Sequence, residues 1–294
     1  MYGGLEAGGT KFVCVIGTGP EDIAATERIP VSTPADTISA AVAFFRRALG
    51  TGVALDAIGI GSFGPLELRP SHAAFGRITT TPKPGWGDTD LVGPFREALR
   101  LPVAIDTDVN AAVLAEVEWG AAQGLRDVLY LTIGTGVGGG AMVGGRTLHG
   151  LGHPEMGHIS VDRHPDDDFP GRCPFHGACF EGMASGPSLE ARFGRRPETL
   201  GPEDRARAAE LVAHYLASGV RSLTYSVAPA RVVVGGGVGM MPGLLERARE
   251  RLRIELAGYP GLPEHQAPNY LVQAALGGMA GPAGTLLIAA RASA

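Results

Sequence analysis

The sequence contains no uninterrupted apolar run that approaches the length of a membrane-spanning helix. It opens with MYGGLEAGGTKFVCVIG, which lacks the basic and then apolar pattern of a secretory signal peptide. Acidic and basic tails are also absent and the net charge is only −5, so the charge balance indicates neither nucleic acid nor an anionic membrane as a partner. We therefore expect a cytoplasmic globular protein, and its 294 residues suffice for two domains of ordinary size.

Cysteine is scarce: the chain has three, and two of them, Cys173 and Cys179, enclose His176 in the segment RCPFHGACFEG. In the cytoplasm such a pair favours a metal site over a disulfide. Tetrahedral zinc needs a fourth ligand, and three upstream histidines lie within reach: His153, His158 and His164. The loop itself is too rich in Pro, Gly and Asp to form a core, so a structural zinc ion would stabilise it. The alternative is an ordinary histidine beside two unpaired thiols.

Glycine, in contrast, is abundant, and three glycine turns each follow an apolar strand pattern. Backbone N–H groups in such turns can bind phosphate oxygens, and glycine lets a nucleotide approach closely. None of the turns has a Walker motif or a dinucleotide fingerprint, and a single one would be equally typical of a tight hairpin. Three together favour a nucleotide bound between two domains. The residues that we predict to bind it are Gly8, Gly9, Thr10, Lys11, Gly134, Thr135, Gly136, Gly138, Gly236 and Gly237.

The segments GGLEAGGTKFVCVIG and YLTIGTGVGGGAMVGG repeat one pattern of strand, Gly/Thr turn and strand, which indicates a duplicated α/β architecture. Between them, TPADTISAAVAFFRRALG reads as a helix that Asp36 or Thr37 caps and Gly50 ends. The final GPAGTLLIAARASA reads as a helix that packs on the N-terminal domain. We expect a small domain of residues 1–116 with 278–294, and a larger domain of residues 117–277 that carries the cysteine loop.

The polar segment DTDVNAA places Asp106, Asp108 and Asn110 between a strand and a helix. A carboxylate there could accept the proton of a substrate hydroxyl as it attacks phosphorus. The alternative is a helix N-cap, which Asp and Asn often form, and the spacing alone favours the cap. Glu155 and Glu181 flank the cysteine loop. Rigid carboxylates recognise polyols well, although simple solvation is the usual fate of glutamate.

These motifs together resemble the ROK family of bacterial sugar kinases and related repressors over nearly the whole chain. EAGGTK and IGTGVGGG resemble the two phosphate loops, GIGSFGP and PKPGW the sugar-side segments, and VVVGGGV the adenosine loop. DVNAA is similar to the Asp-Ala-Asn motif, and PEMGH matches the Glu-x-Gly-His motif. The resemblance implies a two-domain actin-like (ribonuclease H-like) α/β ATPase fold with a cleft between the domains, usually as a homodimer.

The motif Cys-x-x-His-x-x-Cys, together with HPEMGH and ASGP, resembles the bacterial fructokinase branch of this family. This resemblance implies phosphorylation of D-fructose by ATP and Mg²⁺, with Asp108 as the catalytic base. The implied zinc ligands are His158, Cys173, His176 and Cys179, and the implied sugar contacts are Asn110, Glu155, His158 and Glu181. Glu6 replaces the usual aspartate near magnesium, so we expect its contact with the ion to pass through water.

Two alternatives to a fructokinase follow from the same resemblance. The substrate could be another hexose, namely glucose, mannose or N-acetylmannosamine, because the motifs constrain the sugar ring weakly. The chain could also be a non-catalytic sugar sensor. We expect no DNA binding, because the sequence starts at the first strand without the helix-turn-helix that the family's repressors carry.

Overall fold

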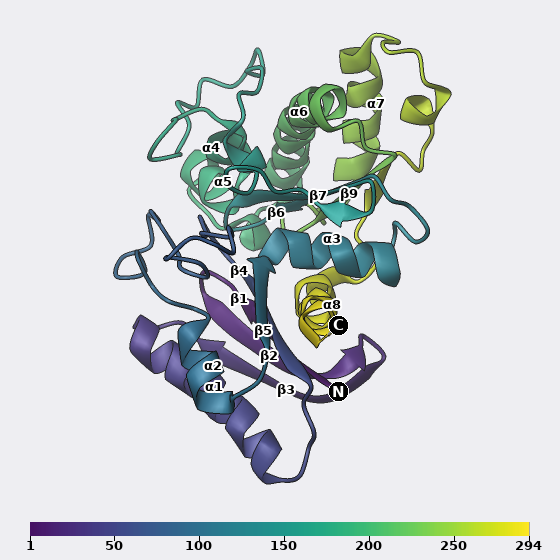
Figure 1. The fold of residues 1–294 in the computed structure, drawn as a ribbon. Helices are drawn as coiled ribbons and strands as arrows, with labels where there is room; N and C mark the ends of the chain where they lie inside the picture. Colours follow the sequence, from purple (N-terminus) through teal and green to yellow (C-terminus); the bar gives the residue numbers. More distant parts are fainter. Residues whose placement is uncertain (294) are drawn as a thin grey trace. The chain divides into compact units, whose positions relative to one another are not determined.

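The computed structural model describes residues 1–293, which form two compact units (Figure 1). Unit 1 consists of Met1–Trp119, Thr147–Pro154 and the C-terminal segment from Gly278. Unit 2 consists of Gly120–Arg146 and Glu155–Gly277. Sequence reasoning did not single out Thr147–Pro154, which belongs to unit 1 although unit 2 flanks it along the chain. The expected division into residues 1–116 with 278–294 and residues 117–277 stays a prediction about independently folding domains.

Unit 1 is built on a five-stranded sheet in the order β3-β2-β1-β4-β5. The first three strands are antiparallel, whereas β4 and β5 run parallel to β1. The strands are β1 (Tyr2–Ala7), β2 (Lys11–Gly19), β3 (Asp22–Pro30), β4 (Ala57–Ser62) and β5 (Val103–Thr107). The helices are α1 (Pro34–Gly50), α2 (Gly93–Leu99), α3 (Asp108–Glu118) and α8 (Ala280–Ser293).

Alternation along β2 divides the core of unit 1 between the two faces of the sheet. Phe12 belongs to the same buried cluster as Phe45 of α1, whereas Val13 packs with Leu286 of α8. Helix α8 approaches β4 so closely that a Cβ added at Gly59 would lie 1.9 Å from the Thr285 carbonyl oxygen. The expected packing of the C-terminal helix on the N-terminal unit is confirmed (Figure 1).

Unit 2 repeats this plan with a sheet in the order β8-β7-β6-β9-β10. In each sheet the central strand pairs antiparallel with the next strand of the chain and parallel with a later one. The duplicated architecture predicted from the sequence is therefore confirmed. The strands are β6 (Val128–Ile133), β7 (Val137–Val143), β8 (Arg146–Thr147), β9 (Arg231–Gly235) and β10 (Leu271–Gln273). The helices are α4 (Phe180–Ala184), α5 (Gly186–Phe193), α6 (Pro202–Val227) and α7 (Leu244–Leu256).

Two predicted helix caps are wrong. Thr33 caps α1 by accepting a hydrogen bond from the Asp36 N–H at 3.2 Å, because Pro34, which has no N–H to satisfy, suits the first helical position. Thr107 caps α3 by accepting from the Asn110 N–H at 3.1 Å. Asp108 and Asn110 therefore lie within the first turn of α3, and neither is its N-cap. No helix within residues 1–293 has the length and apolar character needed to cross a membrane.

Candidate active site and metal site

Four side chains of unit 2 form a compact cluster of metal-ligating groups: His158, Cys173, His176 and Cys179. Their ligand atoms all lie within 4.8 Å of one another. The Cys173 Sγ lies 3.6 Å from the Nδ1 of His158 and 3.8 Å from that of His176, and the Cys179 Sγ lies 3.6 Å from the same nitrogen of His158. Tetrahedral zinc with ordinary Zn–S and Zn–N bonds separates its ligands by roughly 3.3–3.8 Å, which these three distances match.

Local backbone structure explains how one short loop presents three of these ligands. The backbones of Cys173 and Gly177 exchange two hydrogen bonds of 3.1 and 2.9 Å, and Gly177 has a φ of +58° that closes the turn around His176. Cys179 directly precedes α4. Two of the three upstream histidines make other contacts: His153 Nε2 accepts from the Leu66 N–H, and His164 Nδ1 accepts from the Asp166 N–H. His158 alone of the three joins the cluster.

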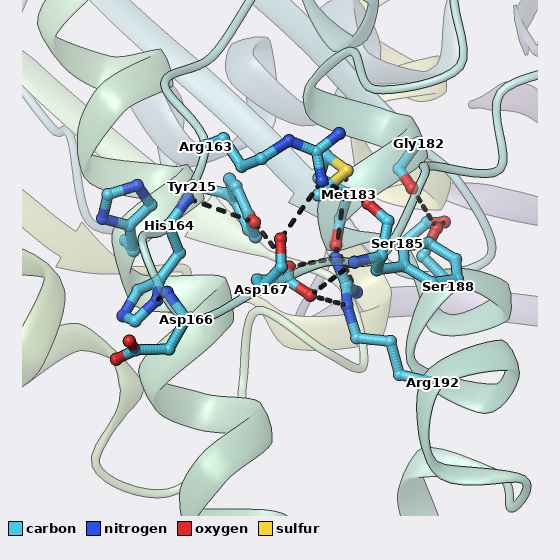
Figure 2. A network of polar contacts seen from close by, with 12 residues as sticks. Arg163, His164, Asp166, Asp167, Gly182, Met183, Ser185, Ser188, Arg192 and Tyr215 are labelled. Carbon is cyan, nitrogen blue, oxygen red and sulfur yellow. Dashed lines mark hydrogen bonds and ion pairs between the residues drawn. The ribbon is translucent and has the colours of Figure 1, made fainter.

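A buried polar network in unit 2 joins Asp167 to Arg192 and Tyr215 (Figure 2). Arg192 of α5 donates from Nε and Nη2 to the Asp167 carboxylate at 3.2 and 2.9 Å, and from Nη1 to the Met183 carbonyl of α4 at 2.6 Å. The Tyr215 hydroxyl of α6 donates to Asp167 at 2.5 Å. Helix α4 also lies against the cysteine loop, because a Cβ at Gly182 would lie 1.9 Å from the Gly177 oxygen. The network and the metal cluster together fix α4.

Helix α4 carries Glu181, one of the predicted sugar contacts. Its Oε2 accepts a hydrogen bond of 3.0 Å from the Val137 N–H, and a Cβ at Gly136 would lie 2.6 Å from the same oxygen. Glu181 therefore contacts the turn between β6 and β7. Glu155 is exposed, and its carbonyl accepts from the His158 N–H at 3.0 Å, so the backbone links it to the metal cluster.

Two of the three predicted nucleotide turns come together in unit 2. The Gly134 carbonyl accepts from the Gly186 N–H at 2.7 Å, and a Cβ at Gly134 would lie 3.8 Å from the Gly237 nitrogen. Gly236 has a φ of +82°, and a Cβ there would lie 2.4 Å from the Ile133 oxygen, so only glycine fits. The turn of Gly134, Thr135, Gly136 and Gly138 thus adjoins the second turn, with Thr135 and Gly237 exposed to solvent.

The third predicted turn joins β1 to β2 in unit 1. It is closed by a hydrogen bond of 3.0 Å from the Gly8 N–H to the Lys11 carbonyl. Gly9, Thr10 and Lys11 are exposed, so a ligand can approach this turn. Lys83, which sequence reasoning missed, donates from Nζ to the Gly9 carbonyl and adds a second cation to this turn. Its place in the segment PKPGW was the available signal.

Two carboxylates of unit 1 influence one another near this turn. Burial, followed by the nearby charge of Asp108, raises the pKa of Glu6 to about 7, while Lys11 and Arg28 oppose this shift. Burial also raises the pKa of Asp108, whose Oδ1 accepts from the Val109 N–H at 2.9 Å. A carboxylate whose pKa is raised toward neutrality is a better proton acceptor. A pair of mutually repelling carboxylates also favours a bound cation.

Asn110 lies two residues beyond Asp108 and is 1% exposed. Its Nδ2 donates to Asp106 Oδ1 at 2.8 Å, and the same oxygen receives the His149 Nε2 at 2.9 Å. The Oδ1 of Asn110 is buried and, within residues 1–293, has no hydrogen-bond partner. Sequence reasoning noted Asp106 without giving it a role and missed His149 altogether, although the HGLGH spacing was a signal. The predicted residues thus occur in both units, with Glu6, Asp108 and Asn110 in unit 1.

The chain is similar in sequence to proteins of known family and activity. The ROK family model matches residues 2–292. The chain is 46% identical to the fructokinase of Zymomonas mobilis over 85% of this chain and 84% of that protein. It is 38% identical to the fructokinase of Pediococcus pentosaceus over 98% of this chain and 97% of that protein. A glucokinase of Halalkalibacterium halodurans is 30% identical over 81% of this chain and 80% of that protein.

Solved structures show the same fold. A ROK hexokinase from Thermus thermophilus matches with a TM-score of 0.78 and 31% identity, over 99% of this chain and 98% of that one. A ROK family glucokinase from Streptomyces griseus, in complex with glucose and AMPPNP, matches with a TM-score of 0.76 and 26% identity over 99% of both chains. These neighbours have the actin-like ATPase fold that the resemblance implied, so the fold prediction is confirmed.

Proposed function

Because the chain belongs to the ROK family, we propose that it is an ATP-dependent fructokinase, which transfers the γ-phosphoryl group of ATP to the 6-hydroxyl of D-fructose. Fructose is proposed as the substrate because of the sequence identities: the two fructokinases share a larger fraction of identical residues with this chain than the glucokinase does. A neighbour that holds AMPPNP supports ATP as the phosphoryl donor.

The proposed chemistry begins with the substrate hydroxyl. Asp108 accepts the proton of the 6-hydroxyl while the oxygen attacks the γ-phosphorus, and the bond from phosphorus to the leaving oxygen of ADP breaks. The raised pKa of Asp108 suits this role. The glycine turns contact the nucleotide, and Lys11 and Lys83 add positive charge beside the first turn. Mg²⁺ would neutralise charge on the phosphates, with Glu6 as its indirect contact.

In this proposal, four polar side chains hold the sugar. Asn110 offers its unpartnered Oδ1 to a sugar hydroxyl. His158 directs Nδ1 toward the thiols of the metal cluster, which leaves Nε2 for the sugar. Glu155 and Glu181 are the two remaining proposed contacts. Zinc held by four protein ligands would be structural, because a closed coordination shell leaves no position for a reacting water.

The homodimer, the cytoplasmic location and the absence of a nucleic-acid partner stay predictions. The substrate is tested by measuring ADP release with fructose, glucose, mannose and N-acetylmannosamine at equal concentrations. We expect kcat/KM for fructose to exceed that of the other sugars by at least about 10-fold. Preference for another hexose would overturn fructose as the substrate and keep the kinase. No turnover by folded, zinc-loaded protein would favour the non-catalytic sugar sensor.

The role of Asp108 has its own test. Replacing it by asparagine keeps the size of the side chain and removes the proton acceptor, so we expect kcat to fall by about 10²–10⁴-fold. The circular dichroism spectrum and the KM for fructose should change little. An Asp108→Asn variant that retains most of its kcat would show that another group accepts the proton.

A further inference from the structure

We propose that Asp106 and His149 are positioning residues that hold the Asn110 amide in one orientation, so that its Oδ1 accepts a hydrogen bond from one hydroxyl group of the sugar. This inference rests on the proposed function, because the hydroxyl belongs to fructose. Asp106 and His149 thereby fix the orientation of the Asn110 side-chain amide, in addition to its proposed contact with the sugar.

The orientation of the amide follows from the chemistry of its neighbour. A carboxylate oxygen at this position can only accept, and it already receives the Thr107 N–H at 2.7 Å. The group of Asn110 that lies 2.8 Å from Asp106 Oδ1 must therefore be the NH₂ group. The reverse orientation would place the amide oxygen against a carboxylate oxygen. Asp106 thus forces the amide oxygen to face away from it.

The opposite end of the amide is the part that a ligand would use. Asn110 is 1% exposed, and its Oδ1 has no hydrogen-bond partner within the described residues. A buried acceptor without a donor is unfavourable, and in a folded protein such a group calls for a bound donor. A neutral amide oxygen can accept a hydrogen bond from a hydroxyl group of a ligand. The ligand must therefore supply a hydrogen-bond donor at this point, and a hydroxyl group of the proposed sugar substrate meets that need.

His149 completes the arrangement from Thr147–Pro154. Its Nε2 lies 2.9 Å from Asp106 Oδ1, and because Asp106 only accepts, this nitrogen carries the proton. The hydrogen bond with Asp106 raises the pKa of His149, although burial acts in the opposite direction. Both the neutral ring with Nε2–H and the charged ring donate to Asp106, so the arrangement survives titration. The Nδ2 of Asn110 and the Nε2 of His149, 3.3 Å apart, are both donors and meet only through Asp106.

A second histidine of the Thr147–Pro154 segment, His153, also lies near Asp106 and Asp108. Asp106 and Asp108 both contribute negative charge near the second histidine of this segment, His153, whose pKa burial lowers. The Nε2 of His153 accepts from the Leu66 N–H at 2.9 Å. It therefore holds the Thr147–Pro154 segment on unit 1 without competing for Asp106. His149 is the member of this pair that reaches Asn110.

The test uses a panel of monodeoxy fructoses, each lacking one hydroxyl other than the 6-hydroxyl that accepts the phosphoryl group, with kcat and KM measured for every sugar. The penalty for each analogue is the factor by which its kcat/KM falls below that of fructose. For the analogue that lacks the hydroxyl bound by Asn110, the wild type should show a penalty of at least about 10-fold. Asn110→Ala should abolish that one penalty and leave the others. Asp106→Asn and His149→Phe should lower the same penalty and raise the KM for fructose, with the KM for ATP unchanged. His149→Gln, which keeps a donor, should restore much of the discrimination.

A matched control is His72→Phe, because His72 is an exposed histidine of unit 1 that faces Glu67 and lies outside this network. Its penalties should equal those of the wild type. If Asp106→Asn and His149→Phe change no penalty, or lower every penalty alike, the positioning role is wrong. Calorimetric binding of the same sugars separates the two proposals. Selective binding without turnover would overturn the proposed function and keep the positioning role, whereas binding of none of the sugars would overturn both.

Discussion

Arg192 and Asp167 form a doubly hydrogen-bonded ion pair inside unit 2, where each side chain is only 6% exposed. Removing one member of a buried pair leaves an uncompensated charge and typically costs about 3–5 kcal/mol. We therefore expect Arg192→Met to lower the free energy of unfolding by about 3 kcal/mol or more. The measurement is guanidinium unfolding monitored by circular dichroism.

The pair of Arg207 and Glu210 supplies a more exposed comparison for this change, with side chains 34% and 53% exposed. Arg207 also donates to the Asp166 carbonyl at 3.0 Å. Arg207→Met should cost less than about 1 kcal/mol, as is usual for surface pairs.

Burial alone raises the pKa of Asp167, but hydrogen bonds from Arg192 and Tyr215 outweigh it and lower this pKa overall. The pair's contribution is therefore present above about pH 4 and is lost on acidification. Equal losses for Arg192→Met and Arg207→Met near neutral pH would show that the network does not anchor α4.

The raised pKa of Glu6 makes a second prediction, about stability and pH. Burial and the charge of Asp108 raise this pKa to about 7, so the folded protein retains the proton that the unfolded chain releases at lower pH. The stabilisation from this proton is complete below the unfolded pKa and is lost as pH rises through about 7. Glu6→Gln removes the ionisation. The free energy of unfolding of this variant, relative to that of the wild type, should therefore increase between about pH 5 and pH 8.5.

Unfolding curves for both proteins across this pH range provide the measurement. Glu21, an exposed glutamate that precedes β3, gives the control variant Glu21→Gln, whose curve should run parallel to that of the wild type. A pH-independent difference between Glu6→Gln and the wild type would mean that Glu6 is as well solvated as a surface residue.

The sequence predicted those parts of the site whose residues are near one another along the chain. The spacing of Cys173, His176 and Cys179 predicted three ligands and left the fourth open among three histidines, and only the family resemblance selected His158. The structure places the four side chains within reach of one ion. The partner of Asp106 escaped prediction because His149 lies 43 positions away, and only the fold brings its segment onto unit 1. The HGLGH spacing could mark His149 as a candidate, but no local pattern shows which distant residue a side chain meets.

The run of three aspartates from 166 to 168 shows a related limit. Its members are chemically identical, yet Asp167 is buried against Arg192 while its two neighbours are exposed. A charged run is usually solvated, so sequence reasoning had no ground to choose one member. The helix caps failed for a similar reason, since Thr33 competed with several adjacent polar residues and the proline that follows it decided the outcome.

A third prediction concerns the first glycine turn. A Cβ at Gly9 would meet no heavy atom within 4 Å, so Gly9→Ala should leave the free energy of unfolding unchanged. If the turn holds phosphate, however, the added methyl group occupies the space of the ligand. The KM for ATP should then rise several-fold while the KM for fructose stays the same. Gly50→Ala is the control, because Gly50 also faces open space but ends α1. An unchanged KM for ATP in Gly9→Ala would remove this turn from the nucleotide site.

The metal cluster permits the sharpest separation of structural and functional effects, because the third cysteine is a built-in control. Cys14 is fully buried in the core of unit 1 and does not belong to the cluster, whereas Cys173 is one of the four grouped residues. We expect Cys173→Ser to lose its zinc, to melt at a lower temperature and to show a higher KM for fructose, with the KM for ATP unchanged. The reason is that zinc and the Arg192 network together hold α4 and its Glu181.

Cys14→Ala should also melt at a lower temperature, because it loses core packing, yet it should keep one zinc ion per chain and the wild-type KM for fructose. Metal content by atomic emission and steady-state kinetics on the same samples distinguish the two variants. Chelation of the wild type should reproduce the Cys173→Ser result. Zinc retained in full by Cys173→Ser would place the ion elsewhere, and metal-free protein with an unchanged KM for fructose would show that the cluster stabilises the fold without shaping the sugar site.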